Sequence, residues 1–168
     1  MGRGFFRDFL AAAYTDQYNA SRSIPRFPKQ RTALSSHPLV NIHMQGLKVL
    51  IVEDDGDLRG LYCFLLANEG CQVRAVRNGL EAITEIESNR PDIVVTDIAM
   101  PVFGGLDLIK TIRADEDLAD LPVLAMTNFA EHFHERALEV GADKAIGKPN
   151  EVEILREAIQ SVLLRSQT

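Results

Sequence analysis

Five short apolar segments alternate with amphipathic segments from residue 47 onward. The apolar segments cover residues 48–52, 72–76, 93–96, 123–126 and 144–146. Between them, hydrophobic residues recur at steps of three and four, as at Leu58, Leu61 and Leu65. Such steps place apolar side chains on one face of a helix, and strands that alternate with helices are typical of βα units on a parallel sheet. The pattern therefore predicts an α/β fold with five strands.

The five apolar segments are of two kinds. The first, third and fourth are hydrophobic at consecutive positions, whereas the second and fifth also contain polar residues. Strands covered by helices on both sides are apolar on both faces, so we expect the former to be central and the latter to be edges. Gly70 and Gly141 follow helical segments, as glycines do at helix C-termini. Asn150 and Glu153 have the spacing of a capping pair, which predicts where the last helix begins.

The first 43 residues differ from the rest of the chain. Residues 21–28 mix Ser, Arg and Pro, and no periodicity persists beyond Tyr18. This composition is typical of disorder, so we expect a disordered N-terminal extension over residues 1–43 and one folded domain over residues 44–168. Apolar residues within positions 5–13 have helical spacing beside arginines, and a short amphipathic helix for a membrane surface or a partner is the alternative.

The composition agrees with a single domain. The chain has 168 residues, of which 46% are hydrophobic and 25% are charged, and one soluble domain usually takes about 100 to 200 residues. No stretch reaches the roughly 18 consecutive apolar residues of a membrane span. The two cysteines, Cys63 and Cys71, lie among apolar neighbours, which favours reduced thiols and a cytoplasmic location.

Charge is divided unevenly along the chain. Residues 1–43 contain six basic and two acidic residues, a net charge of +4, whereas residues 44–168 contain twelve basic and twenty-two acidic residues, a net charge of -10. A domain this acidic does not attract nucleic-acid phosphates. We therefore expect no nucleic-acid partner, and any phosphate chemistry would need a bound cation.

Polar residues follow the predicted strands at their carboxyl ends, which meet at one edge of a parallel sheet. Binding sites in open α/β sheets form at this edge, where the strand order reverses. The residues there are Glu53, Asp54 and Asp55 after the first strand, Asp97 after the third, Thr127 after the fourth, and Lys148 with Pro149 after the fifth. Each has a plainer explanation when taken singly, as a solvated strand end, a helix cap or a turn. Their joint order favours one site.

Carboxylates gathered at one edge repel each other by about 3 kcal/mol per pair at roughly 5 Å and an effective dielectric constant of about 20. A hard divalent cation relieves this repulsion, and the lack of Cys and His ligands favours Mg²⁺ over zinc. Beside Mg²⁺, Asp97 would act as a nucleophile toward a phosphoryl group and form an aspartyl phosphate. The Lys148 ammonium and the Thr127 hydroxyl would help to neutralise the transferred group.

Across residues 44–168 the chain resembles the receiver domain of two-component response regulators. The motifs that carry the resemblance are VLIVEDD, NGLEAI, PDIVVTDIAMP, GG, LPVLAMT and GADKAIGKP, in the family's order and spacing. The resemblance implies a flavodoxin-like, doubly wound five-stranded parallel sheet of order 2-1-3-4-5 with five helices.

The same motifs imply roles for the acidic residues. Asp97 corresponds to the phosphoacceptor, and Mg²⁺ is the implied cofactor. Arg59 lies five residues after Asp54, as in the family, so Glu53 and Asp54 correspond to the acidic pair of the metal site. Asp54 then binds the metal directly, Glu53 acts through water, and Asp55 has no direct role.

The resemblance also completes the site. The backbone carbonyl of Ala99 corresponds to another metal ligand, next to Asp97 itself. Thr127 corresponds to the switch hydroxyl and Lys148 to the phosphate-binding cation, so that these two residues and Asp97 form the catalytic set. A cis peptide bond between Lys148 and Pro149 is implied as well.

Some positions depart from the family pattern. Ala145 stands three residues before the lysine, where an aromatic residue usually swings inward with the threonine, so we expect a weakened version of that switch. Asn128 and Asn150 also replace the family's usual residues. The side chains expected to orient hydrolytic water are Ala99 and Phe129, and neither can hydrogen-bond water. We therefore predict slow self-dephosphorylation.

The sequence thus predicts a single-domain response regulator that takes a phosphoryl group on Asp97 from a sensor histidine kinase or a phosphotransfer protein. With no output domain expected, it would act on a downstream protein target through its fourth helix, fifth strand and fifth helix. The main alternative is a pseudo-receiver, an adaptor that works without phosphorylation; the intact Asp97, Thr127 and Lys148 argue against it.

Two further alternatives share parts of the pattern. A flavodoxin-type cofactor binder needs a loop rich in glycine and hydroxyl groups after the first strand, where this chain has four acidic residues within residues 53–57. A phosphohydrolase with an aspartyl nucleophile on the first strand needs a second Asp two residues after the nucleophile in an otherwise apolar setting, and this strand lacks that arrangement. Both are disfavoured.

Overall fold

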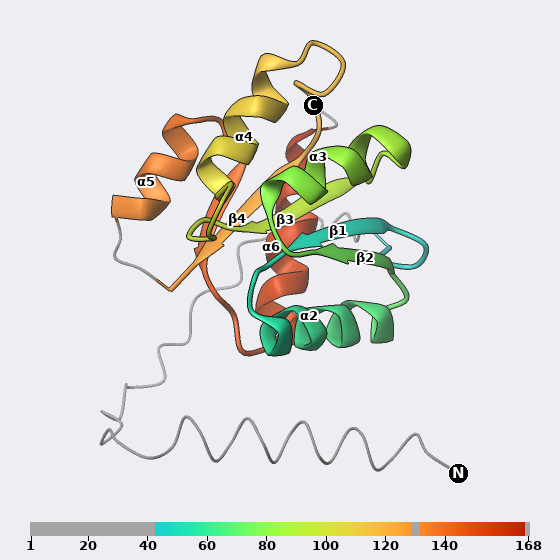
Figure 1. Ribbon diagram of the computed structural model, residues 1–168. Helices are drawn as coiled ribbons and strands as arrows, with labels where there is room; N and C mark the ends of the chain where they lie inside the picture. Colours follow the sequence, from blue (N-terminus) through green and yellow to red (C-terminus); the bar gives the residue numbers. More distant parts are fainter. Residues whose placement is uncertain (1–42, 129–131, 167–168) are drawn as a thin grey trace, which may run out of the picture. The chain divides into compact units, whose positions relative to one another are not determined.

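The computed structural model of the chain describes residues 43–128 and 132–166, which contain one five-stranded sheet. All four strand pairings are parallel, and the strands lie in the order β2-β1-β3-β4-β5 (Figure 1). The strands are β1 (Lys48–Val52), β2 (Gln72–Val76), β3 (Ile93–Asp97), β4 (Val123–Thr127) and β5 (Lys144–Gly147). Each strand lies where the sequence pattern predicts it, and the predicted strand order is confirmed.

Five helices of the described residues cover the two faces of this sheet. They are α2 (Gly56–Asn68), α3 (Gly79–Ser88), α4 (Gly105–Ala114), α5 (His132–Glu139) and α6 (Val152–Arg165). Helices α2 and α6 pack on one face, and α3, α4 and α5 pack on the other (Figure 1). This is the flavodoxin-like, doubly wound α/β fold that was predicted. None of the helices in the described ranges is long and apolar enough to cross a bilayer.

Each face of the sheet has its own hydrophobic core because side chains alternate along a strand. Ile51 of β1 belongs to the cluster with Tyr62 of α2 and Ile159 of α6. Its neighbour Leu50 belongs to the opposite cluster, with Ile109 of α4. These five side chains are at most 1% exposed, and burying each contributes about 1.5–3 kcal/mol.

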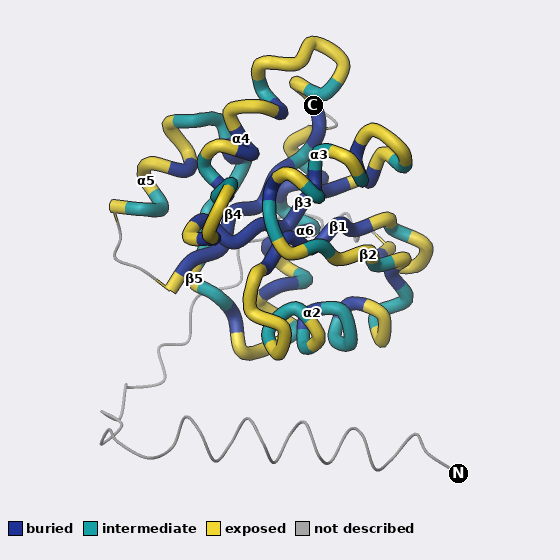
Figure 2. The backbone as a smooth tube through the Cα atoms, in the orientation of Figure 1, coloured by how far each residue is buried: buried dark blue, intermediate teal, exposed yellow. Residues whose placement is uncertain are grey.

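Burial separates the central strands from the edges, as predicted. Strands β3 and β4 are buried at every position and β1 at all but its first, whereas no residue of β2 or β5 is fully buried (Figure 2). The central strands can be uniformly apolar because helices cover both of their sides. The site described below therefore stands on the most rigidly packed part of the sheet.

Two helix C-termini follow the expected local chemistry, and one expected N-cap does not. Gly70 and Gly141 have φ angles of +89° and +108°, which glycine adopts easily at helix C-termini. The expected pairing of Asn150 with Glu153 is wrong, because Glu151 is the N-cap residue of α6 and makes no capping hydrogen bond through its side chain. Asn150 lies one residue too early to cap.

Some sequence-based expectations concern other parts of the chain. The described residues contain no cis peptide bond, so the implied cis bond between Lys148 and Pro149 is wrong. The expected disorder of the N-terminal extension, and the alternative amphipathic helix within it, lie outside the described residues apart from His43. The role expected of Phe129 lies outside them too.

Candidate functional site

The strand order reverses at β1 and β3, and acidic residues follow both strands at their carboxyl ends. Val52 of β1 is the partner of Thr96 of β3. The next residues along the two strands, Glu53 and Asp97, therefore come side by side. The parallel register alone produces this meeting, because both strands run toward the same edge.

Three carboxylates gather at this edge. One oxygen each of Glu53, Asp54 and Asp97 lies within 4.8 Å of the others. Glu53 and Asp97 are buried, with 0% and 4% of their surface exposed, whereas Asp54 is exposed to solvent. The cluster thus has a buried floor and one side chain at the surface.

Lys148 brings a positive charge to the cluster from the loop between β5 and α6. Its Nζ lies 2.7 Å from Oε2 of Glu53 and 3.0 Å from Oδ2 of Asp97. The Lys148 main-chain N–H donates to the Thr127 carbonyl over 3.2 Å, which continues the β4–β5 pairing into the loop. The structure therefore brings Lys148 to Glu53, 95 residues away in the chain, and to Asp97.

Burial and mutual contact shift the pKa values of Lys148 and Glu53. Burial lowers the pKa of Lys148, but its hydrogen bond to Glu53 and the negative charges of Asp97 and Glu53 outweigh burial, so the pKa lies above its usual value. Lys148 is therefore an ammonium ion at neutral pH. Burial raises the pKa of Glu53, against the opposing pull of Lys148. One ammonium ion faces three carboxyl groups, and negative charge remains in surplus.

Thr127 and Ala99 complete the edge. Met126 is the partner of Asp97 across the β3–β4 pairing, so Thr127, the next residue, ends β4 beside the Asp97 loop and is 1% exposed. Ala99 is exposed two residues after Asp97, and its N–H donates to Oδ1 of Asp97 over 3.4 Å. The structure brings all the residues expected at the site to the same edge of the sheet.

The site fits a hard divalent cation. Carboxylate oxygens are the ligands that Mg²⁺ prefers, and Mg²⁺ usually binds through one or two of them while keeping several waters. Glu53, Asp54 and Asp97 supply such oxygens at short mutual distances, and the backbone carbonyl of Ala99 is on the same loop as Asp97. The exposure of Asp54 leaves room for the waters. These residues could hold Mg²⁺, whose charge would offset the surplus that Lys148 leaves.

Three contacts help to shape the site. The first, a helix cap at Asp55, was among the plainer explanations for that residue, and the other two were not anticipated from the sequence. Asp55 is the N-cap of α2, and its Oδ1 accepts hydrogen bonds from the N–H groups of Asp57 and Leu58. The salt bridge from Lys148 to Glu53 is the second. The third is the close approach of Gly105 of α4, where a Cβ atom would clash with the Asp97 carbonyl oxygen. Only the first had a sequence clue, an Asp before a helical segment.

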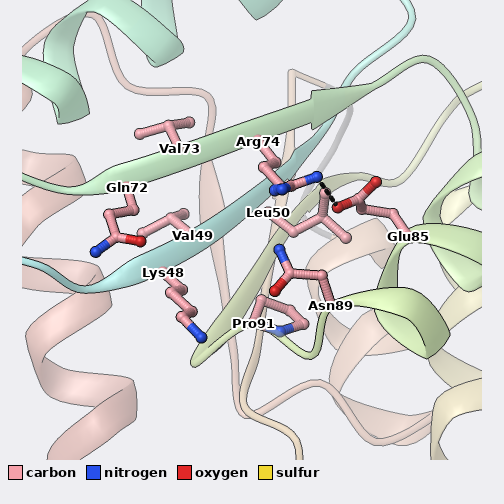
Figure 3. Close-up of a pocket in the computed structure, with 9 residues that line it drawn as sticks. All are labelled: Lys48, Val49, Leu50, Gln72, Val73, Arg74, Glu85, Asn89 and Pro91. Carbon is pink, nitrogen blue, oxygen red and sulfur yellow. Dashed lines mark hydrogen bonds and ion pairs between the residues drawn. The ribbon is translucent and has the colours of Figure 1, made fainter.

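A separate hollow lies away from this edge. It has a volume of about 130 Å³ and opens near the amino ends of β1 and β2, beside the last turn of α3 (Figure 3). Arg74 and Glu85 form an ion pair of 2.8 Å on its wall. None of the acidic residues of the cluster lines it, so it plays no part in the candidate site.

Comparisons with known proteins point to one family. The profile of the response regulator receiver domain matches residues 49–160. The polar-differentiation response regulator DivK of Brucella anthropi is 36% identical over 116 residues, which make up 68% of this chain and 94% of that protein. The crystal structure of the chemotaxis response regulator CheY4 of Vibrio cholerae has a TM-score of 0.65 and 28% identity, and the match covers 70% of this chain and 99% of that one.

A further similar structure is the receiver domain of a sensor histidine kinase from Pseudomonas aeruginosa, which has a magnesium ion coordinated in its active site cleft. Its TM-score is 0.65 and its identity 28%, over 70% of this chain and 98% of that one.

Proposed function

The chain belongs to the response regulator receiver domain family, and from this premise we propose that it accepts a phosphoryl group on Asp97. The donor would be a sensor histidine kinase or a phosphotransfer protein in the cytoplasm. One observation carries the proposal: Asp97 lies at the tip of the central strand β3, within 4.8 Å of two other carboxylates and 3.0 Å from the Lys148 ammonium.

Each side chain has a defined part in the transfer. An oxygen of the Asp97 carboxylate forms a bond to phosphorus while the bond from phosphorus to the donor's imidazole nitrogen breaks, and the electron pair stays on that nitrogen. Asp54 and Asp97 would hold Mg²⁺ directly and Glu53 through water, and the metal would neutralise negative charge on the phosphoryl oxygens. The burial of Asp97 keeps bulk water away from the new acyl phosphate.

Lys148 and Thr127 would respond to the new group. In the structure, the Lys148 ammonium is bound to Glu53 and Asp97. A phosphoryl group on Asp97 offers it stronger acceptor oxygens, so Lys148 would exchange its contact with Asp97 for one with the phosphoryl group. The Thr127 hydroxyl, on the neighbouring strand, would donate to another phosphoryl oxygen.

The resulting change would reach a partner protein through α5, β5 and α6. Ala145 of β5 packs against the cluster that contains Ala137 of α5 and is only partly buried, and its small side chain cannot swing as an aromatic residue does. We therefore expect a small conformational shift. Amide spectra that are identical with and without beryllofluoride, a phosphoryl mimic, would contradict any switch. The net charge of -10 over residues 44–168 favours a protein target over nucleic acid.

Acetyl phosphate tests the chemistry directly. Incubation of the protein with acetyl phosphate and Mg²⁺ should add the mass of one phosphoryl group, and Asp97→Asn should add none. Asp55→Asn is the matched control, because it removes a neighbouring charge and keeps the α2 cap. Wild type that stays unmodified with ample donor and Mg²⁺ would overturn the proposal and favour the pseudo-receiver alternative, in which the fold serves only as an adaptor.

The acyl phosphate should persist once formed. Ala99 lies beside Asp97, and its methyl side chain cannot hydrogen-bond a hydrolytic water, so we predict slow self-dephosphorylation. The measurement is the decay of the phosphorylated mass after the small-molecule donor has been removed. Decay within seconds would show the reasoning to be wrong.

A further inference from the structure

Arg59 of α2 contacts the site but is neither an expected metal ligand nor the phosphoacceptor, so its contacts have no role assigned above. Its Nη1 donates to the backbone carbonyl of Glu53 over 2.8 Å and to that of Asp54 over 3.1 Å. One guanidinium nitrogen thus binds two successive carbonyls of the loop between β1 and α2.

These two carbonyls belong to the peptide units on either side of the Asp54 Cα atom. The orientations of the two flanking peptide planes determine φ and ψ of the residue between them, and with them the direction of its Cα–Cβ bond. Asp54 itself is exposed, so packing does not hold its side chain. Arg59 therefore fixes the direction in which the Asp54 side chain leaves the backbone.

The polar groups of Asp55, the next residue of the loop, have hydrogen-bond partners of their own. The Asp55 side chain caps α2, the Asp55 carbonyl accepts from the Arg59 N–H over 2.9 Å, and the Asp55 N–H donates to Oε1 of Glu53 over 3.3 Å. Arg59 is thus held by the first turn of α2, and from there its side chain reaches back to the loop. Removing it would leave two carbonyls to water and free the Asp54 peptide planes to rotate.

We infer that Arg59 is a positioning residue for Mg²⁺ binding, which it supports by fixing the backbone of Asp54. This inference rests on the proposed function, because it needs the acidic cluster to bind Mg²⁺. A purely electrostatic role predicts the opposite sign: a cation near the carboxylates repels Mg²⁺, so removing it would tighten binding. The two explanations are therefore separable by affinity alone.

The test is the Mg²⁺ affinity of the full chain by isothermal titration calorimetry, at a temperature where circular dichroism shows folded protein. Arg59→Met should bind Mg²⁺ about tenfold more weakly than wild type, as is typical when a group that orients a metal ligand is lost. Arg77→Met is the matched control, because the Arg77 side chain is 71% exposed and pairs with Glu81. It removes the same charge and should leave the affinity unchanged.

A second measurement reports the backbone itself. The Cα and carbonyl chemical shifts of Asp54 depend on its φ and ψ, and they should change in metal-free Arg59→Met but not in Arg77→Met. If Arg59→Met does not fold, Arg59→Gln carries the same expectation, since its amide is two atoms short of the guanidinium position. Wild-type-like or tighter Mg²⁺ binding by the Arg59 variant would overturn the inference alone. Wild type that binds no Mg²⁺ would overturn both the inference and the metal site of the proposed function.

Discussion

Replacing Asp54 by Asn should stabilise the metal-free protein and remove most of its stabilisation by Mg²⁺. The Asp54 carboxylate lies within 4.8 Å of the Glu53 and Asp97 carboxylates. Lys148 forms ion pairs with those two residues, whereas Asp54 forms no ion pair within the described residues. Asp54 therefore meets the repulsion of two neighbours, which the Lys148 ammonium offsets only in part.

Coulomb's law gives the size of the effect. Two unit charges 4.8 Å apart repel by about 0.9 kcal/mol in water and by about 3.5 kcal/mol at an effective dielectric constant of about 20. Because Asp54 is exposed, each repulsion lies near the lower figure, and the Lys148 ammonium that pairs with the same two carboxylates offsets about one of them. Asn has nearly the same shape without the charge, so the free energy of unfolding in EDTA should rise by about 1 kcal/mol.

Mg²⁺ should reverse the ranking of the two proteins. A ligand that binds only the folded state stabilises it by about 2.7 kcal/mol at a concentration of 100 times its Kd. Wild type should gain this stability in excess Mg²⁺. Asp54→Asn should gain little, because a neutral amide oxygen replaces the carboxylate expected to bind the metal directly.

Urea unfolding followed by far-ultraviolet circular dichroism, in EDTA and in MgCl₂, measures both effects. Asp55→Asn is the control: Asn caps helices about as well as Asp, and Asp55 accepts hydrogen bonds from the first turn of α2. It should keep the full response to Mg²⁺. Lower stability of Asp54→Asn in EDTA, or a lost Mg²⁺ response in Asp55→Asn, would refute the reasoning.

Three other predictions concern single positions. Val102 has a φ angle of +72° and is 87% exposed. Val102→Asn should raise the free energy of unfolding by about 1 kcal/mol in urea titrations, because Asn tolerates the left-handed region and little packing is lost. A loss of stability would contradict this prediction. Gly105→Ala should destabilise the protein by about 2 kcal/mol or more and slow the labelling of Asp97 by acetyl phosphate, because its Cβ would meet the Asp97 carbonyl oxygen. Gly60→Ala is the control: a Cβ there has nothing within 4 Å, so it should stabilise α2 by about 1 kcal/mol. Equal effects of the two substitutions on the free energy of unfolding would be inconsistent with this packing. Burial, aided by the charge of Glu69, raises the pKa of the Cys71 thiol to about 11, so only about one thiol in a thousand is ionised at pH 8. The alkylation of Cys71 by iodoacetamide should therefore accelerate as the pH rises toward about 11. Fast alkylation of Cys71 at pH 8 would argue against a raised pKa.

Much of this fold could be predicted from the sequence because the relevant forces are local. Periodicity of two or of about 3.6 residues, and uninterrupted runs such as Val49–Val52, report directly which side chains are buried. The glycines at positions 70 and 141 mark helix ends because only glycine adopts their φ angles without strain. The cap expected at Asn150 was wrong because helix starts can shift by one residue, and tertiary contacts decide which start is used.

The sequence by itself determined which strands are central and which are edges. It also determined that Glu53, Asp54, Asp97, Thr127 and Lys148 gather at one edge of the sheet, because a parallel sheet brings the carboxyl ends of its strands together. Only the tertiary structure decided how these groups touch. Three interactions join separate elements over a few ångströms: the salt bridge between Lys148 and Glu53, the hydrogen bonds from Arg59 to two backbone carbonyls, and the packing of Gly105 against Asp97. Such contacts depend on loop paths and side-chain rotamers, which are settled when the helices pack on the sheet and leave no periodic trace in the chain.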